Sequence, residues 1–111
     1  MNLSKTLLGS VVLMVVPSLS FAEMPRYDVK GYCQVIASVG GTYSETMNAG
    51  CFEMEQSSYN NMKPKWDNLS SNLQKYCDQI ARVGGGGSYS MLEGCIQMEE
   101  QAGSTDKTFK Y

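Results

Sequence analysis

Four cysteines carry the most reactive side chains in this chain of 111 residues, and they fall into two pairs. Cys33 and Cys51 are separated by 18 positions, and so are Cys77 and Cys95. Structural zinc sites and thioredoxin-like redox sites usually hold two cysteines in a Cys-x-x-Cys pair. This spacing is absent here. Four cysteines in a small exported protein instead predict two disulfides, with no metal and no cofactor.

Methionines are the second group that could do chemistry. Met47 and Met54 are seven residues apart, as are Met91 and Met98. Thioether sulfur is a soft ligand that suits Cu(I), so these residues suggest a copper site. Seven residues are also two turns of a helix, and methionine fills irregular gaps between packed helices. We therefore expect these four side chains to lie in the core.

Carboxylates are the third group. Glu53 and Glu55, with Glu99 and Glu100, could form the acid pair of a glycosidase. They lie among polar residues, so we expect solvated helix faces instead. The chain has no histidine that could serve as the base for a serine or cysteine nucleophile. The glycine run at 84–87 lacks the strand and the lysine of a phosphate-binding loop, so we interpret it as a flexible turn.

An internal repeat contains all four cysteines. Thirteen residues recur 44 positions later, without a gap. In the first copy they are Tyr32, Cys33, Ile36, Ala37, Val39, Gly40, Gly41, Ser44, Met47, Gly50, Cys51, Met54 and Glu55. A repeated unit of this length indicates one supersecondary structure used twice.

Apolar residues spaced by three and four positions predict helices on both sides of each glycine turn. The expected helices cover 28–39, a segment ending near Ser58, Trp66 to Val83, and a segment that begins at Ser88 or Ser90. We saw no alternation typical of strands. The sequence predicts an all-α fold, in which two tandem disulfide-closed helical hairpins (four helices) form one small domain. The hairpins would span 23–62 and 63–102, packed through the Trp66–Val83 stripe, with a flexible tail at 103–111.

The glycine turns also predict which cysteines pair. Each turn lies near the midpoint between two cysteines, so these lie level across an antiparallel helix pair. Gly50 and Gly94 precede Cys51 and Cys95, where a disulfide requires the helices to approach closely. We expect Cys33–Cys51 and Cys77–Cys95. The alternative joins the hairpins through Cys33–Cys77 and Cys51–Cys95.

The first 22 residues resemble a cleaved signal peptide. Lys5 is followed by an apolar run from Leu7 to Val16, and Ser20-Phe21-Ala22 fits the cleavage site. The run is about half the length of a membrane-spanning helix, so we do not expect an integral membrane protein. The mature chain from Glu23 would carry 8 basic and 11 acidic residues. That balance argues against nucleic-acid binding, which needs a basic face. We expect a periplasmic protein, and the alternative is a secreted one.

Tyrosines are the best candidates for a binding surface. Tyr43 and Tyr89 lie just beyond the two glycine turns, where exposure at one end of the molecule would favour protein contacts. The alternative is partial burial beside the turns.

The repeated pattern from Tyr32 to Glu55 and from Tyr76 to Glu100 resembles small exported proteobacterial proteins with cysteine-containing helical hairpins, a group without an established activity. The resemblance implies export and disulfides, and it transfers no functional residue. We expect a non-enzymatic interaction or accessory protein of an envelope or secretion assembly, with a protein partner. The alternatives are a conjugation-associated, plasmid-borne or toxin-like protein, and a binder of metal or cell-wall ligands.

Overall fold

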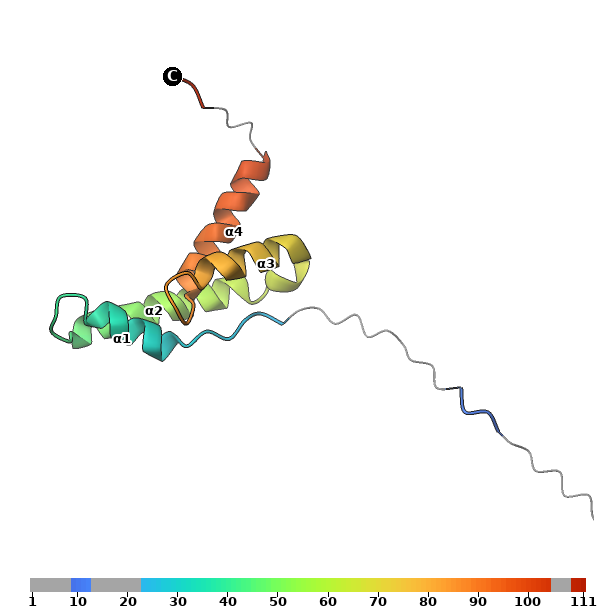
Figure 1. Cartoon of the computed structure of the whole chain (residues 1–111), viewed down its shortest axis with the longest axis horizontal. Helices are drawn as coiled ribbons and strands as arrows, with labels where there is room; N and C mark the ends of the chain where they lie inside the picture. Colours follow the sequence, from blue (N-terminus) through green and yellow to red (C-terminus); the bar gives the residue numbers. More distant parts are fainter. Residues whose placement is uncertain (1–8, 13–22, 105–108) are drawn as a thin grey trace, which may run out of the picture.

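The computed structural model describes residues 9–12, 23–104 and 109–111. Most of the predicted signal peptide and residues 105–108 of the predicted tail lie outside these ranges. The described residues form four α-helices and one short 3₁₀ helix, without a strand (Figure 1). The elements are α1 (Val29–Ala37), α2 (Glu45–Met62), η1 (Trp66–Asn68), α3 (Ser71–Ala81) and α4 (Tyr89–Ser104). None of the described helices is long and apolar enough to cross a bilayer.

Side-chain caps determine where the helices begin. Asp28, Ser44 and Ser70 precede α1, α2 and α3, and each accepts a hydrogen bond from a backbone N–H three residues later. The Ser70 cap divides the predicted helix over 66–83 into η1 and α3. Helix α2 continues beyond the predicted end near Ser58 to Met62, and α4 continues two residues beyond the predicted hairpin boundary.

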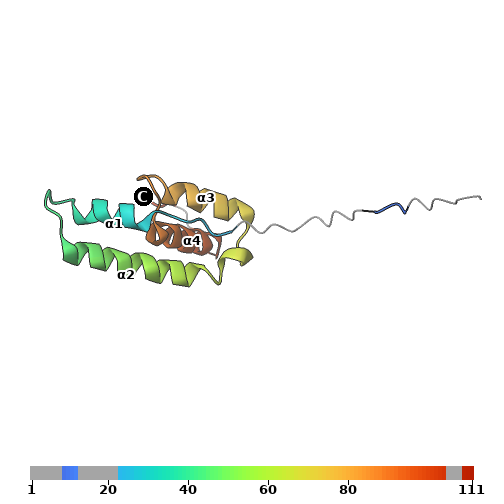
Figure 2. The ribbon, with the colours of Figure 1, turned by 90° about the horizontal axis from the view of Figure 1, so that it is seen from below.

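Two disulfides close the two hairpins, as predicted. Cys33–Cys51 joins α1 to α2, and Cys77–Cys95 joins α3 to α4. The Cα atoms of each pair are 5.5 Å apart. The cross-hairpin alternative is therefore wrong. Figure 2 shows α1 and α2 running side by side in opposite directions. The all-α fold of two tandem disulfide-closed hairpins is confirmed.

The core lies where the two hairpins meet, because α2 packs against α4. Met62 from α2 and Trp66 from η1 are buried with Leu92 and Ile96 of α4. Leu92 and Ile96 were not predicted as core residues. The predicted packing through the Trp66–Val83 stripe is correct only in part. Trp66 and Cys77 of this stripe are buried, whereas Tyr76, Ile80 and Val83 are exposed. The buried side of α3 carries Gln74, Cys77 and Ala81, so Tyr76 and Ile80 lie on its other sides, and Val83 lies beyond the end of the helix.

The two glycine turns differ in their packing. Gly41 has φ +87° and lies in open space, whereas Gly87 has φ +95° and is buried against the ring of Tyr27. A side chain at residue 87 would be strained by the left-handed backbone and would overlap that ring. The second turn is therefore packed, contrary to the flexible turn expected from its four glycines.

Replacing Gly87 by alanine should destabilise the fold. The left-handed conformation costs about 1–2 kcal/mol for a residue with a Cβ. Forcing a methyl group into a filled site costs about 1–3 kcal/mol more. In urea unfolding, Gly87→Ala should lower the free energy of unfolding by about 2–5 kcal/mol, the sum of these two costs. Gly84→Ala is the matched control in the same turn, since a Cβ there meets no atom within 4 Å. Equal stability of both variants would contradict the packing of this turn.

Candidate functional site

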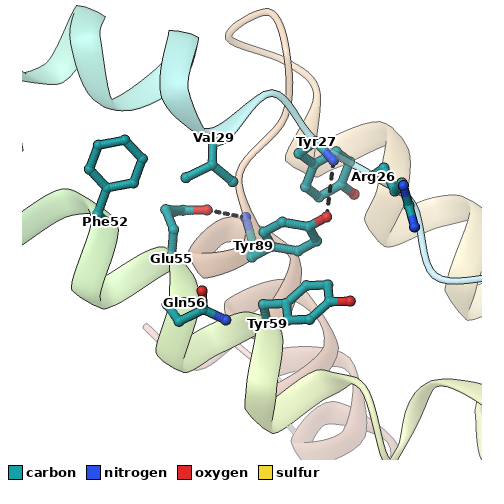
Figure 3. Close-up of a pocket in the computed structure, with 8 residues that line it drawn as sticks. All are labelled: Arg26, Tyr27, Val29, Phe52, Glu55, Gln56, Tyr59 and Tyr89. Carbon is teal, nitrogen blue, oxygen red and sulfur yellow. Dashed lines mark hydrogen bonds between the residues drawn. The ribbon is translucent and has the colours of Figure 1, made fainter.

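A buried carboxylate connects the two hairpins. Glu55 of α2 is 1% exposed and lies at the N-terminus of α4. Its Oε1 accepts hydrogen bonds from the Ser88 hydroxyl at 2.7 Å and the Ser90 hydroxyl at 2.8 Å. Its Oε2 accepts the backbone N–H of Tyr89 (Figure 3). The free N–H groups and dipole of a helix N-terminus stabilise a negative charge. The solvated position expected for Glu55 is therefore wrong.

Tyr89 lies at the centre of an aromatic cluster beside this carboxylate. Its ring centroid is 4.6 Å from that of Tyr27 and 5.0 Å from that of Tyr59. Its hydroxyl donates to the carbonyl of Pro25 and accepts the backbone N–H of Tyr27. Only 5% of Tyr89 is exposed. The prediction that Tyr89 lies on an exposed interface is wrong.

The segment before α1 is held against both hairpins by Tyr27. The Tyr27 hydroxyl donates to Asp78 Oδ1 at 2.7 Å, and the same oxygen accepts Arg82 Nε at 2.9 Å. The Arg82 guanidinium also lies over the Tyr27 ring. Burial, and then the hydrogen bond to Asp78, raise the pKa of the Tyr27 phenol well above its usual range. Tyr27 therefore stays neutral and acts as a hydrogen-bond donor.

A cavity of about 390 Å³ opens beside these groups. Its lining residues are Arg26, Tyr27, Val29, Phe52, Glu55, Gln56, Tyr59 and Tyr89 (Figure 3). Both carboxylate oxygens of Glu55 and the hydroxyl of Tyr89 already have hydrogen-bond partners within the protein. Glu55 and Tyr89 therefore hold α2, α4 and the segment before α1 together. Within the described residues no cluster of three histidine, cysteine or acidic side chains could hold a metal ion.

The residues shared by both repeats lie mainly on the outside of the hairpins. The exposed fractions of Met47, Met54, Met91 and Met98 are 46%, 65%, 39% and 72%. The prediction that these methionines form the core is wrong, because Leu92 and Ile96 occupy the buried side of α4. Tyr76 and Ile80 are exposed as well, and their first-copy equivalents Tyr32 and Ile36 are half-buried.

A groove lies on the first hairpin beside the start of α4, since Glu55 and Ser90 also line it. It has a volume of about 270 Å³ and includes Tyr32 and Ile36 from α1 and Met47, Gly50 and Met54 from α2. We call these five residues the first repeat face. Their equivalents Tyr76, Ile80, Met91, Gly94 and Met98 are the second repeat face. All ten residues recur as the same type at the matched position, so each hairpin presents the same set of side chains.

Gly50 and Gly94 have no packing role within the chain. A Cβ added at either glycine would meet no atom within 4 Å. The expectation that they permit close approach at the disulfides is therefore wrong. Glycine inside a helix costs about 0.5–1 kcal/mol relative to alanine, and the chain carries this cost twice. The feature that both glycines share is an open position between two exposed methionines.

Tyr43 is 45% exposed and precedes α2, in the turn that follows α1. It therefore lies apart from the buried Tyr89, and the two tyrosines do not form one surface. Leu92 and Ile96 are buried residues outside the repeated set, and the burial of Glu55 does not follow from the repeat, because its equivalent Glu99 is exposed. A signal was present: Leu92 and Ile96 replace Asn48 and Phe52 of the first copy, so these positions break the repeat.

Comparison of the chain with protein-family models, curated proteins and solved structures returns no match. Only the residues and their geometry therefore bear on the function.

Replacing Glu55 by glutamine should weaken the junction between the hairpins. The amide would place an N–H₂ donor against backbone and hydroxyl donors at the start of α4, and it would remove the charge. A buried group left without its partner costs about 1–3 kcal/mol, and we expect a loss of this size in urea unfolding. The matched control is Glu99→Gln, since Glu99 is the repeat equivalent and is exposed. A Glu55→Gln variant as stable as Glu99→Gln would contradict the capping role.

Proposed function

We propose that this protein is a non-enzymatic periplasmic protein that binds a protein partner in the bacterial cell envelope. Its two disulfides support an oxidising compartment outside the cytoplasm. The signal-like residues at 1–22 favour export to the periplasm. The polar groups at the junction of the two hairpins hold the chain's own helices together. A small chain of this kind fits an accessory role in an envelope or secretion assembly.

The observation that most directly supports this proposal is the duplicated outer surface. Both repeat faces keep the same tyrosine, isoleucine, glycine and methionines, and the four methionines are exposed. Intramolecular packing does not require these exposed side chains. Aromatic residues and methionine are enriched at protein interfaces, and exposed apolar patches commonly mark binding sites. A partner that binds these faces accounts for their retention in both copies.

A metal-binding role would also use exposed methionines, but the groove is poor in ligands. Met47 and Met54 contribute two thioethers. The chain has no histidine, and all four cysteines are in disulfides. Transition-metal sites usually hold three or four protein ligands. Apolar contact with a protein is therefore the function we favour for these side chains.

A site-specific photo-crosslinker tests this proposal in the native cell. We expect p-benzoylphenylalanine at the positions of Met54 and Met98 to form adducts of the same mass with a partner. The matched control is Ala49, an exposed residue of α2 outside the first repeat face. The double variant Gly50→Leu, Gly94→Leu should abolish both adducts, because leucine would fill the open positions.

Adducts that form equally well from Ala49, or that persist when both glycines are leucine, would contradict binding at the repeat faces. An adduct of twice the mass of this chain would identify a second copy, which also contradicts a distinct envelope partner.

A further inference from the structure

A second groove continues the first repeat face toward the other hairpin. It has a volume of about 450 Å³, and Met54 and Ser90 line both grooves. Its lining residues are Glu53, Met54, Ser57, Ser58, Ser90, Glu93, Gly94 and Gln97. The two grooves therefore form one continuous surface that passes from Gly50 of α2 to Gly94 of α4. We call it the inter-hairpin groove.

The inter-hairpin groove is acidic at one end. Glu53 and Glu93 line it, and no lysine or arginine is among its lining residues. Glu93 Oε1 accepts a long hydrogen bond from the Ser58 hydroxyl at 3.4 Å. Glu93 Oε2 is buried and has no hydrogen-bond partner. A buried carboxylate oxygen without a donor is costly. Since Glu93 lines the groove, a cationic side chain placed in the groove would offset its negative charge.

The other end has the form of a socket for one side chain. Tyr32, Ile36, Met47 and Met54 line the groove with Gly50, and a Cβ added at Gly50 would meet none of their atoms within 4 Å. In helix–helix packing, an apolar knob from one helix inserts into a hole made by four residues of its partner. Methionine adapts its shape to the inserted group. The glycine leaves the bottom of the hole free.

We infer that the inter-hairpin groove binds an amphipathic basic helix of the partner protein. A large apolar side chain of that helix inserts over Gly50, and a lysine or arginine pairs with Glu93. This inference rests on the proposed function and adds the chemistry of the partner. The acidic groove attracts a basic helix and repels an acidic one, since like charges repel each other across an interface.

Two designed peptides test the inference on the disulfide-bonded protein. Each has 18 residues in a helical amphipathic pattern, one of leucine and lysine and the other of leucine and glutamate. We expect the leucine–lysine peptide to bind in a fluorescence anisotropy titration and the leucine–glutamate peptide to bind at least about tenfold more weakly. Gly50→Leu should weaken binding of the leucine–lysine peptide about tenfold by filling the hole. Glu93→Gln should weaken it by about threefold or more and reduce its dependence on salt.

Matched controls separate the groove from general attraction to an acidic protein. Ala49→Leu adds the same bulk on another side of α2, and Glu99→Gln removes a charge outside the groove. Both should bind the leucine–lysine peptide as the unsubstituted chain does. Equal binding by Gly50→Leu, equal binding of both peptides, or no binding of the leucine–lysine peptide would overturn the inference. If the inference fails in this way, crosslinks from Met54 and Met98 would still support the proposed function. The absence of these crosslinks would refute the proposed function, whatever the peptide result.

Discussion

The contact between the Glu55 carboxylate and the N-terminus of α4 is the constraint on which the arrangement of the two hairpins depends. Each hairpin is closed by its own disulfide, but most of the buried apolar residues lie where the hairpins meet. Glu55 fixes the position of α2 against α4 through the first residues of α4, Tyr89 and Ser90. The aromatic cluster around Tyr89 then holds the segment that precedes α1.

This contact joins different parts of the two repeats, so it has no counterpart made by the equivalent residues. By the repeat, Glu99 corresponds to Glu55, and Ser44 to Ser88. Glu99 is exposed, and the side chains that cap α1, α2 and α3 are Asp28, Ser44 and Ser70. The first-hairpin equivalents of Tyr89 and Leu92 are Glu45 and Asn48, which are polar.

The residues that are identical in the two repeats thus fall into two groups with different physical roles. Cys33, Cys51, Cys77, Ala37 and Ala81 are buried inside the hairpins and Cys95 is partly buried, and these small residues allow the helices to pack closely. The two repeat faces point outward and contribute little to the core. The residues that bury the junction, Leu92 and Ile96, differ from their first-copy equivalents. Duplication therefore preserved the hairpin and its outer surface, while the junction depends on positions where the copies diverge.

The helices, the hairpins and the disulfide pairing could be predicted because local spacing determines them. Periodicity and glycine turns locate the helices, and the equal distance of two cysteines from a turn predicts their pairing. The site could not be predicted in the same way. Glu55 and Glu99 are the same residue in the same local sequence, and only the packing of α2 on α4 buries one of them. Met47 and Leu92 both lie on helical stripes, so periodicity alone does not say which stripe faces the core.

The most direct test of this account is the stability of a variant in which Met47, Met54, Met91 and Met98 are all glutamine. Exposed substitutions each change stability by about 0.5 kcal/mol or less, so we expect a total change below about 2 kcal/mol in urea unfolding. The same variant should lose the crosslinks to the partner, here formed from p-benzoylphenylalanine at the positions of Tyr32 and Tyr76. Buried methionines would each cost about 2–5 kcal/mol when truncated, and replacing four would unfold the protein. An unfolded variant would therefore contradict the assignment of the repeat faces to binding.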